Sequence, residues 1–486
     1  MDSKPKRRVP VIRERLREFG DWSTTQGITQ ASLAKRNVCI GFWLVVTLIA
    51  LGLLIWQVVL LVQQYYQYQV DVQIELRFEQ RVFPAVTICD LNPYKQSVAY
   101  KQPKIDRLMS TYRYQSQKIV CEAVSFCEFH PNATLDSFAE MYELNTINNT
   151  GVLQRRVQAL LGLEAAAYDL SAAKVSFDSL IRSCSFNSLE CSADYWTPWN
   201  DPSMGNCFIF NLNSNLSTQR AGPVYGLRMR LATNVSEYLA TVTAAGISVL
   251  VHDQAVHPFS DSMGYVIQPG TTTTLSVTYM EMSRLGPPYG ECTDEYPDGY
   301  LYDMAYSAEG CQRSALQNQM VSQCGCFDPA YPAPNNTNVS ACAIPENLDC
   351  WSDLTSAAND SACQQPCNEG LYTVTTSSGK WPLNGAAAGC FTPGCERELA
   401  ANMAMVEVYY EKLNYENVQE SPDDSVSDML SNLGGQIGEF FRLPSVHPVR
   451  LWLGMSVISL IEFIVLGFQV CLICCSPRVG KYIDFD

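Results

Sequence analysis

Two long apolar runs divide the chain. The first covers residues 38–62, and the second covers residues 451–475 and contains Glu462 and Gln469. An α-helix rises about 1.5 Å per residue, so each run is long enough to cross a hydrocarbon core of about 30 Å. The first run follows 37 residues that lack a small-residue cleavage pattern, which favours an anchor over a cleaved signal peptide. The pattern therefore predicts two transmembrane helices.

The segment between these runs combines strand and helix patterns and shows no internal repeat. β-branched and apolar stretches predict strands at residues 83–89, 246–252, 272–279 and 405–410. Residues 405–410 are taken as the last strand before the chain returns to the membrane. Helix-forming composition predicts helices near residues 152–173 and at residues 307–323. We therefore expect a mixed β fold with peripheral helices.

Charge, cysteines and sequons place this segment outside the cell. Residues 1–37 carry nine basic and four acidic residues, and such an excess beside a first span keeps the N-terminus in the cytoplasm. Two spans then return residues 476–486 to the cytoplasmic side. Sixteen of the 20 cysteines lie between Cys89 and Cys395, an even number that predicts a disulfide framework. Glycosylation sequons occur in the same segment at Asn132, Asn148, Asn215, Asn234, Asn335, Asn338 and Asn359.

The overall acidity does not by itself select a function. A formal net charge of −16 suits a protein that concentrates cations or senses protons, but ordinary solubility explains it equally well. The sequence contains no Ser/His/Asp set, phosphate-binding loop or paired carboxylates, so we expect no enzyme, no cofactor and no nucleic-acid partner. We expect no metal site either, because metal-ligand spacing is absent from the four histidines, His130, His252, His257 and His447.

A series of short motifs runs in order through the chain. They are QYYQY (64–68), FPAVTICDLN (83–92), GNCFIFN (205–211), PPYGEC (287–292), CGC (324–326), CQQPCNEGLY (363–372), SSGKWP (377–382), YYEKLNYENVQE (409–420), LSNLGGQIG (430–438) and GMS (454–456). The ordered set resembles the degenerin/epithelial sodium channel/acid-sensing ion channel family over roughly residues 26–470. This resemblance implies a two-span subunit of a trimeric, sodium-selective, amiloride-sensitive plasma-membrane channel. The trimer would contain identical or related subunits, and Na⁺ would be the permeant ion.

The resemblance also implies a domain division and a disulfide pairing. The division is a cytoplasmic segment (1–37), a first span (38–62), an extracellular cysteine-rich domain (63–430), an outer pore region with the second span (431–475) and a cytoplasmic tail (476–486). A further bond of the family falls on Ala315 and Ser361, where both cysteines are absent together. The implied pairs are Cys89–Cys207, Cys184–Cys191, Cys292–Cys367, Cys311–Cys363, Cys324–Cys350 and Cys326–Cys342, with local bridges Cys121–Cys127 and Cys390–Cys395.

The second span contains the expected pore residues. Gly454, Met455 and Ser456 resemble the family's selectivity tripeptide, in which backbone carbonyls replace part of a sodium ion's hydration shell. Outside that context, Gly-X-Ser in an apolar helix usually serves packing. Glu462 is the stronger signal, because a carboxylate inside a span costs about 2.5–3.5 kcal/mol and normally faces water or a partner. It follows Gly454 by close to two helical turns, so a trimer would carry a ring of three carboxylates. The alternative is a snorkelling side chain near the boundary.

Further positions match gating elements of the family. Gly27 occupies the second place of a His-Gly pair, whose histidine is here replaced by Gln26. Ser431 matches a small-residue site at which bulky replacements hold the pore open, and Asn432 stands where related channels often have Asp. The remaining pair, Tyr68 and Tyr289, matches an aromatic contact that couples the ectodomain to the first span, although either tyrosine alone is more often a plain core residue.

The main departure from the family is an insert at residues 439–450 (EFFRLPSVHPVR). As a continuous helix it would add about 18 Å and turn the following residues by about 120°. Pro444 and Pro448 disfavour such a helix. The insert is either an extracellular loop that leaves a shorter span or an artefact of splicing or gene assignment.

Three rival interpretations remain open. An ATP-gated two-span trimeric channel shares the topology, but it needs clustered basic residues in the ectodomain to bind triphosphate. A two-span scavenger or adhesion receptor has no pore, and the intramembrane Glu462 speaks against it. A non-conducting regulatory subunit of the same family is compatible with the insert. Protons, a peptide, matrix tethering and constitutive leak are all open as the gating stimulus.

Overall fold

The fold was examined in a computed structural model of the chain, in which two compact units are distinguished. The first unit contains residues 1–71 and 421–486, and the second contains residues 72–420. The structure describes residues 15–21, 23, 26–34, 36–124, 127–334, 338–356, 363–383, 389–439, 464–467 and 470. Each boundary of the second unit lies within ten residues of the corresponding boundary predicted for the extracellular domain, residues 63–430. The limits of the predicted domains stay a prediction.

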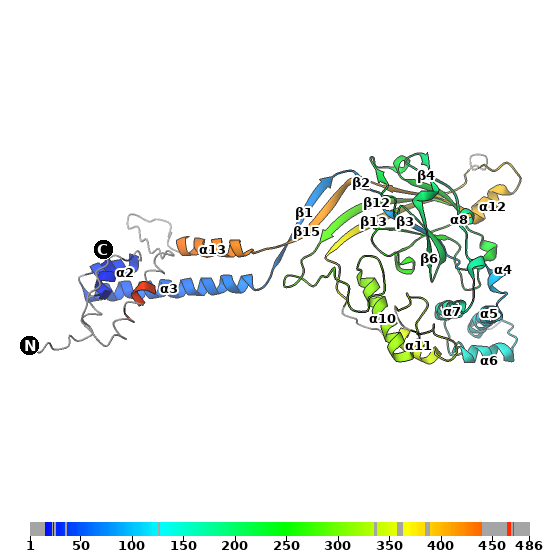
Figure 1. Cartoon of the computed structure of the whole chain (residues 1–486), viewed down its shortest axis with the longest axis horizontal. Coiled ribbons are helices and arrows are strands. Elements are labelled where there is room, and N and C mark those ends of the chain that lie inside the picture. Colours follow the sequence, from blue (N-terminus) through cyan, green and yellow to red (C-terminus); the bar gives the residue numbers. More distant parts are fainter. Residues whose placement is uncertain are drawn as a thin grey trace, which may run out of the picture. The chain divides into compact units, whose positions relative to one another are not determined.

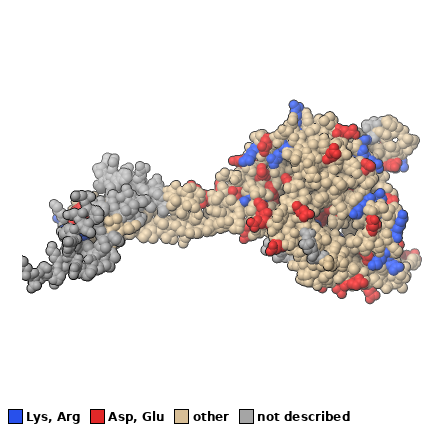
Figure 2. Space-filling model, in the orientation of Figure 1, with Lys and Arg blue, Asp and Glu red and all other residues tan. Residues whose placement is uncertain are grey.

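The first unit contains a long apolar helix. Helix α3 spans Asn37–Tyr65 with a mean hydropathy of 2.8, and among the described residues it alone is long and apolar enough to cross a membrane. No charged residue lies on it (Figure 2), and only 6% of its most apolar window is buried within the protein. An apolar surface of this kind is compatible with a lipid environment. The unit also contains α2 (Gln26–Leu33) and α13 (Val426–Glu439).

An eight-stranded sheet forms one layer of the second unit (Figure 1). Strand β12 is its centre and pairs with β13 along its full length, antiparallel, while β14 and then β15 pair parallel with its other edge. Seven of the strands lie side by side in the order β1-β15-β12-β14-β9-β4-β5, and β13 pairs with β12 outside this series. The strands are β1 (Val70–Phe78), β4 (Ile181–Phe186), β5 (Leu189–Glu190), β9 (Leu227–Ala232), β12 (Thr271–Ser283), β13 (Asn368–Lys380), β14 (Met403–Tyr410) and β15 (Asn414–Pro422).

A five-stranded antiparallel sheet packs against the first. All six residues of β3 are buried, and so are all six residues of β10, because apolar side chains of neighbouring elements cover both strands. Phe83, Phe210 and Leu275 belong to the core that the two sheets share. The strand order is β11 (Tyr265–Ile267), β10 (Ile247–His252), β3 (Ala85–Asp90), β7 (Gly205–Phe210) and β6 (Trp196–Asp201), and a separate pair joins β2 (Arg81–Val82) to β8 (Ser217–Thr218).

Helices gather on one side of the sheets around a second core (Figure 1). Leu108 of α5, Leu160 of α7 and Trp351 of α11 are all buried there. Asn132 and Asn149 cap α6 and α7 by accepting backbone N–H bonds, as N-cap residues commonly do. The helices of this group are α4 (Gln96–Ala99), α5 (Pro103–Ala123), α6 (Ala133–Met141), α7 (Thr150–Ala165), α10 (Ala308–Cys324) and α11 (Leu348–Ser356). The second unit also contains α8 (Phe177–Leu180), α9 (Ser260–Met263) and α12 (Cys395–Asn402).

The structure agrees with most predicted elements and corrects one. Predicted strands at residues 83–89, 246–252 and 272–279 correspond to β3, β10 and β12, and the predicted helix at residues 307–323 corresponds to α10. The predicted strand at residues 405–410 is confirmed as β14, but the prediction that it is the last strand was wrong, because β15 follows. Its sequence, NYENVQESP, is mostly polar and lacks the apolar alternation that marks a strand. Pairing with β12 and β1 holds it instead.

Candidate functional site

The predicted pore and gating residues belong to the first unit. Gly27 lies in α2, whereas Ser431 and Asn432 lie on α13 and are exposed. Near the C-terminal end of α3, the Gln64 side-chain amide donates to a carboxylate oxygen of Asp424 at 3.0 Å. This contact, which the sequence did not predict, ties the end of α3 to the segment before α13. The tripeptide Gly454, Met455 and Ser456, Glu462 and insert residues 440–450 lie outside the described residues.

The two tyrosines expected to couple the ectodomain to the first span lie in different units. Tyr68 follows α3 with a left-handed backbone (φ 49°), and its ring centroid is 6.1 Å from that of Tyr66. Tyr289 lies in a turn in which its N–H donates to the Gly286 carbonyl at 3.2 Å. Their contact with each other stays a prediction.

Among the residues that the structure describes, eight disulfides join the same pairs that the family resemblance implied. Three of them fix α10 and its surroundings: Cys311–Cys363, Cys324–Cys350 and Cys326–Cys342. Cys292–Cys367 joins the loop after β12 to the start of β13. The others are Cys89–Cys207, Cys184–Cys191, Cys121–Cys127 and Cys390–Cys395. Ala315 lies within α10, and Ser361 lies outside the described residues.

The sequon asparagines that the structure describes are on the surface. They are exposed at Asn132, Asn148, Asn215, Asn234 and Asn338, while Asn335 and Asn359 fall outside the described part of the chain. In the Asn234 sequon, the Ser236 hydroxyl donates to the Asn234 amide oxygen at 2.7 Å. Their surface positions are compatible with glycosylation, which stays a prediction.

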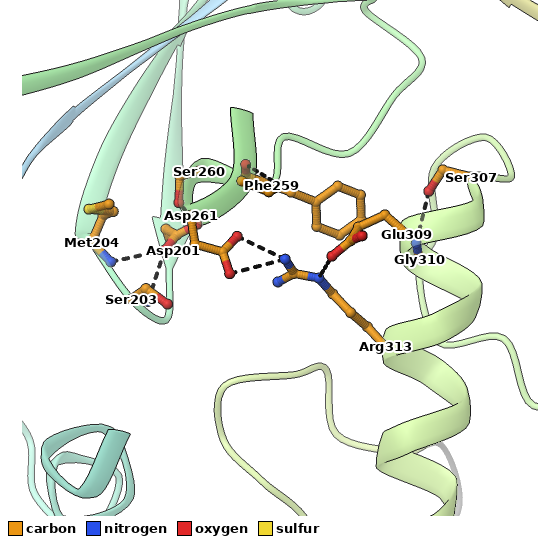
Figure 3. A network of polar contacts seen from close by, with 11 residues as sticks. Asp201, Ser203, Met204, Phe259, Ser260, Asp261, Ser307, Glu309, Gly310 and Arg313 are labelled. Carbon is orange, nitrogen blue, oxygen red and sulfur yellow. Dashed lines mark hydrogen bonds and ion pairs between the residues drawn. The ribbon is translucent and has the colours of Figure 1, made fainter. Parts of the chain in front are cut away.

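A polar network built on Arg313 attaches α10 to α9, the short helix between strands β10 and β11 (Figure 3). The Arg313 guanidinium donates to both carboxylate oxygens of Asp261, at 2.9 and 3.0 Å, and to Glu309 at 2.6 Å. It also lies 4.6 Å from the ring centroid of Phe259. Burial lowers the pKa of Arg313, but the bonds to Asp261 and Glu309 outweigh this effect and raise it above its ordinary value. The charge of Arg313 is therefore permanent.

The N-terminus of α10 is fixed by two further contacts. The Ser307 hydroxyl caps the helix by accepting the Gly310 N–H at 3.1 Å (Figure 3). A Cβ at Gly310 would lie 2.5 Å from the Tyr300 hydroxyl, so only glycine fits without a shift. With the disulfides, these contacts make α10 a firmly attached element.

Two histidines lie in the body of the ectodomain as neutral groups. His252 is buried and its Nε2 lies 2.8 Å from the Thr87 hydroxyl. His257 packs against the rings of Trp199 and Tyr302, with centroids 5.0 and 4.6 Å away. Burial, together with the positive charge of Arg313, lowers the pKa of His257 to about 4, and burial also lowers the pKa of His252. Neither side chain is charged at neutral pH.

A cavity of about 770 Å³ lies among α7, the turn after β6 and α11. Asp201 and Asp328 contribute carboxylates to its lining, and both are buried. Asp201 accepts the N–H groups of Ser203 and Met204 at 2.8 and 2.9 Å (Figure 3), and Asp328 accepts the Trp351 indole N–H at 2.7 Å. These carboxylates therefore hold neighbouring segments together.

The fold and these contacts define a class: a disulfide-rich mixed β/α domain joined to a unit with an apolar, membrane-compatible helix. A family model described as "Amiloride-sensitive sodium channel" matches residues 19–466. The chain belongs to this amiloride-sensitive sodium channel family, whose members are ion channels and not enzymes.

Known relatives include nematode degenerins. Degenerin-like protein unc-105 of Caenorhabditis elegans is 37% identical over 328 residues, which cover 62% of this chain and 35% of that protein. Degenerin unc-8 of the same species is 32% identical over 367 residues, covering 70% and 46%. Degenerin mec-4 of Caenorhabditis briggsae is 37% identical over 331 residues, covering 62% and 40%. The chain thus spans between a third and a half of the length of these relatives.

Proposed function

We propose that the chain is a subunit of a trimeric, sodium-selective, amiloride-sensitive cation channel of the plasma membrane. Both termini are cytoplasmic in this proposal, and residues 63–430 are extracellular. The observation that carries it is the extent of the family match, which runs to residue 466 and so includes the tripeptide and Glu462 as well as the first apolar run and most of the second. A receptor that shared only the ectodomain would not need these intramembrane residues.

The proposed conduction needs only the permeant Na⁺ and no cofactor. Three copies of the second span bring the backbone at Gly454, Met455 and Ser456 around one axis, where carbonyl oxygens replace part of the hydration shell. The carboxylates of Glu462 then form a ring that attracts cations and offsets the cost of placing each charge within the membrane.

The ectodomain is proposed to control the pore through strands that continue toward the membrane. Strand β15 leads along the chain into α13, on which Ser431 and Asn432 lie. Because α10 is fixed by disulfides and by the Arg313 network, a stimulus that acts on the ectodomain would move a stiff assembly. Protons, a peptide and the matrix all remain candidate stimuli.

Glu462 offers a direct test of the proposed pore. We expect Glu462→Gln to reduce Na⁺ conductance or its preference over K⁺ by at least two-fold at equal surface expression, because the carboxylate ring loses its charge. The matched control is Glu190→Gln in β5, where the glutamate is exposed. Equal currents in Glu462→Gln and the wild type would show that this carboxylate does not line the pore.

The insert at residues 439–450 favours one second candidate, a non-conducting regulatory subunit of the same family. It separates α13 from the tripeptide in the sequence and so interrupts the expected outer pore. Co-expression separates the two: a regulatory subunit carries no current alone but changes the current of a related conducting subunit. A receptor without a pore would do neither.

A further inference from the structure

The Arg81 side chain occupies a wedge between two tyrosine rings. Its guanidinium carbon lies 3.6 Å from the ring centroid of Tyr279 and 4.0 Å from that of Tyr415. The two ring centroids are 5.6 Å apart with an interplanar angle of 62°. The Arg81 side chain is only 17% exposed. A guanidinium that is shielded from water and lies over two aromatic faces interacts with them more strongly than an exposed one.

Hydrogen bonds fix this stack from both sides. Glu79 lies 3.5 Å from the Arg81 guanidinium and also accepts a hydrogen bond from the Tyr415 hydroxyl. The backbone carbonyl of the next residue, Val82, accepts a bond from the Tyr410 hydroxyl at 2.9 Å. The two residues of β2 therefore contact β12 through Tyr279, β14 through Tyr410 and β15 through Tyr415.

Strand β15 pairs with β1 at one edge and with β12 at the other, and its attachment to the central strand β12 is short. Its pairing with β12 covers four residue pairs, from Met280 with Glu416 to Ser283 with Gln419, whereas β13 pairs with β12 over thirteen. The stack sits one residue before this short pairing begins, at Tyr415. Loss of the stack therefore releases the start of β15, whereas the long β12–β13 pairing keeps the rest of the sheet in place.

We propose that Arg81 is a positioning residue that fixes the start of β15 against β12 and thereby sets the conformation of the chain that leads into α13. This inference rests on the proposed channel function, in which α13 belongs to the outer pore. Arg81 acts through the two tyrosine rings and does not contact the permeant ion. Lysine retains the charge over the rings, whereas glutamine removes it.

The first experiment does not depend on conduction. Lys412 lies exposed in the turn between β14 and β15, so trypsin cleavage after Lys412 reports release of β15. In purified full-length protein we expect Arg81→Gln to raise the cleavage rate at this bond at least five-fold and Arg81→Lys at most two-fold. The variant Lys412→Gln lacks this trypsin site and so identifies the fragment that cleavage after Lys412 produces. Arg182→Gln, at an exposed arginine of β4, is the matched control and leaves the rate unchanged. General cleavage at other sites in Arg81→Gln would show global unfolding and overturn the proposal.

The second experiment measures sodium current per channel at the cell surface for the same variants. We expect at least a three-fold change in Arg81→Gln and less than two-fold in Arg81→Lys and Arg182→Gln. Faster cleavage with unchanged current would leave Arg81 a purely structural residue and overturn its role in gating. A wild-type chain that reaches the surface without current would overturn the proposed function and the gating role together, while the cleavage rates would still decide whether Arg81 fixes β15.

Discussion

The Arg313 network predicts a large loss of stability from one substitution. Arg313→Met keeps the length of the aliphatic stem but deletes three hydrogen bonds to carboxylates and the contact with the Phe259 ring. The carboxylates of Asp261 and Glu309 are 45% and 42% exposed, so water rehydrates them and little charge is stranded. Partly exposed ion pairs contribute up to about 1 kcal/mol each and a shielded cation–π contact about 1 kcal/mol, which gives roughly 2–3 kcal/mol in all.

Thermal unfolding of the purified full-length protein measures this loss. At roughly 2 °C per kcal/mol, we expect Arg313→Met to lower Tm by about 4–6 °C. The matched control is Arg113→Met in α5, where an exposed arginine bonds the Tyr100 hydroxyl and lies 5.6 Å from its ring. Its Tm should fall by no more than about 2 °C, because water already screens that arginine.

A double-mutant cycle with Asp261→Asn tests whether the network acts as a unit. Because Arg313 and Asp261 share two hydrogen bonds, we expect a coupling free energy of about 1 kcal/mol, so that the double variant is less destabilised than the sum of the single ones. Strictly additive losses, or equal falls in Tm for Arg313→Met and Arg113→Met, would refute the reasoning.

Three further predictions follow from the disulfides, a histidine and the pore region. Removing Cys292–Cys367, whose cysteines are 75 residues apart, should lower the free energy of unfolding by about 4 kcal/mol, whereas removing Cys390–Cys395, at a separation of 5, should lower it by about 2 kcal/mol. The fall in Tm of each variant measures these losses. Equal losses would contradict the loop-entropy account. The pKa of His257 in the folded protein is about 4, below its ordinary value of 6.5. The unfolded chain therefore binds more protons than the folded one, and the stability of the fold decreases as the pH drops from about 6.5 toward 4. His257→Phe should remove about 1–2 kcal/mol of that fall between pH 7 and 5, so a Tm profile identical to the wild type would count against a neutral, half-buried His257. Deleting residues 439–450 should preserve or increase sodium current at equal surface expression, whereas loss of current would show that the insert belongs to the pore.

Local composition was sufficient to predict the elements that are continuously apolar or helix-forming. The buried strands β3 and β10 consist mainly of β-branched and apolar residues, and α10 has helix-forming residues after Ser307. Strand β15 escaped prediction because its polar sequence is held by neighbouring strands and its own residues do not favour a strand.

The contacts that matter most for the site join residues that are distant in the sequence. Arg313 and Asp261 are 52 residues apart, and Tyr415 and Glu79 are 336 apart, so no local pattern could reveal either contact. The disulfide pairing likewise did not follow from the spacing of sixteen cysteines, and the family resemblance was needed to choose among many combinations. By contrast, a carboxylate within a predicted span, such as Glu462, is visible in a single sequence because its cost within a membrane is high.

A voltage-clamp recording of cells that express the chain alone tests the central claim most directly. With surface expression verified, external Na⁺ should be exchanged for K⁺ or a large organic cation, with and without amiloride and across pH. The proposed function predicts an inward Na⁺ current that amiloride blocks and that increases when a bulky side chain replaces Ser431. A chain that reaches the surface and carries no sodium current, even with that replacement, would contradict it.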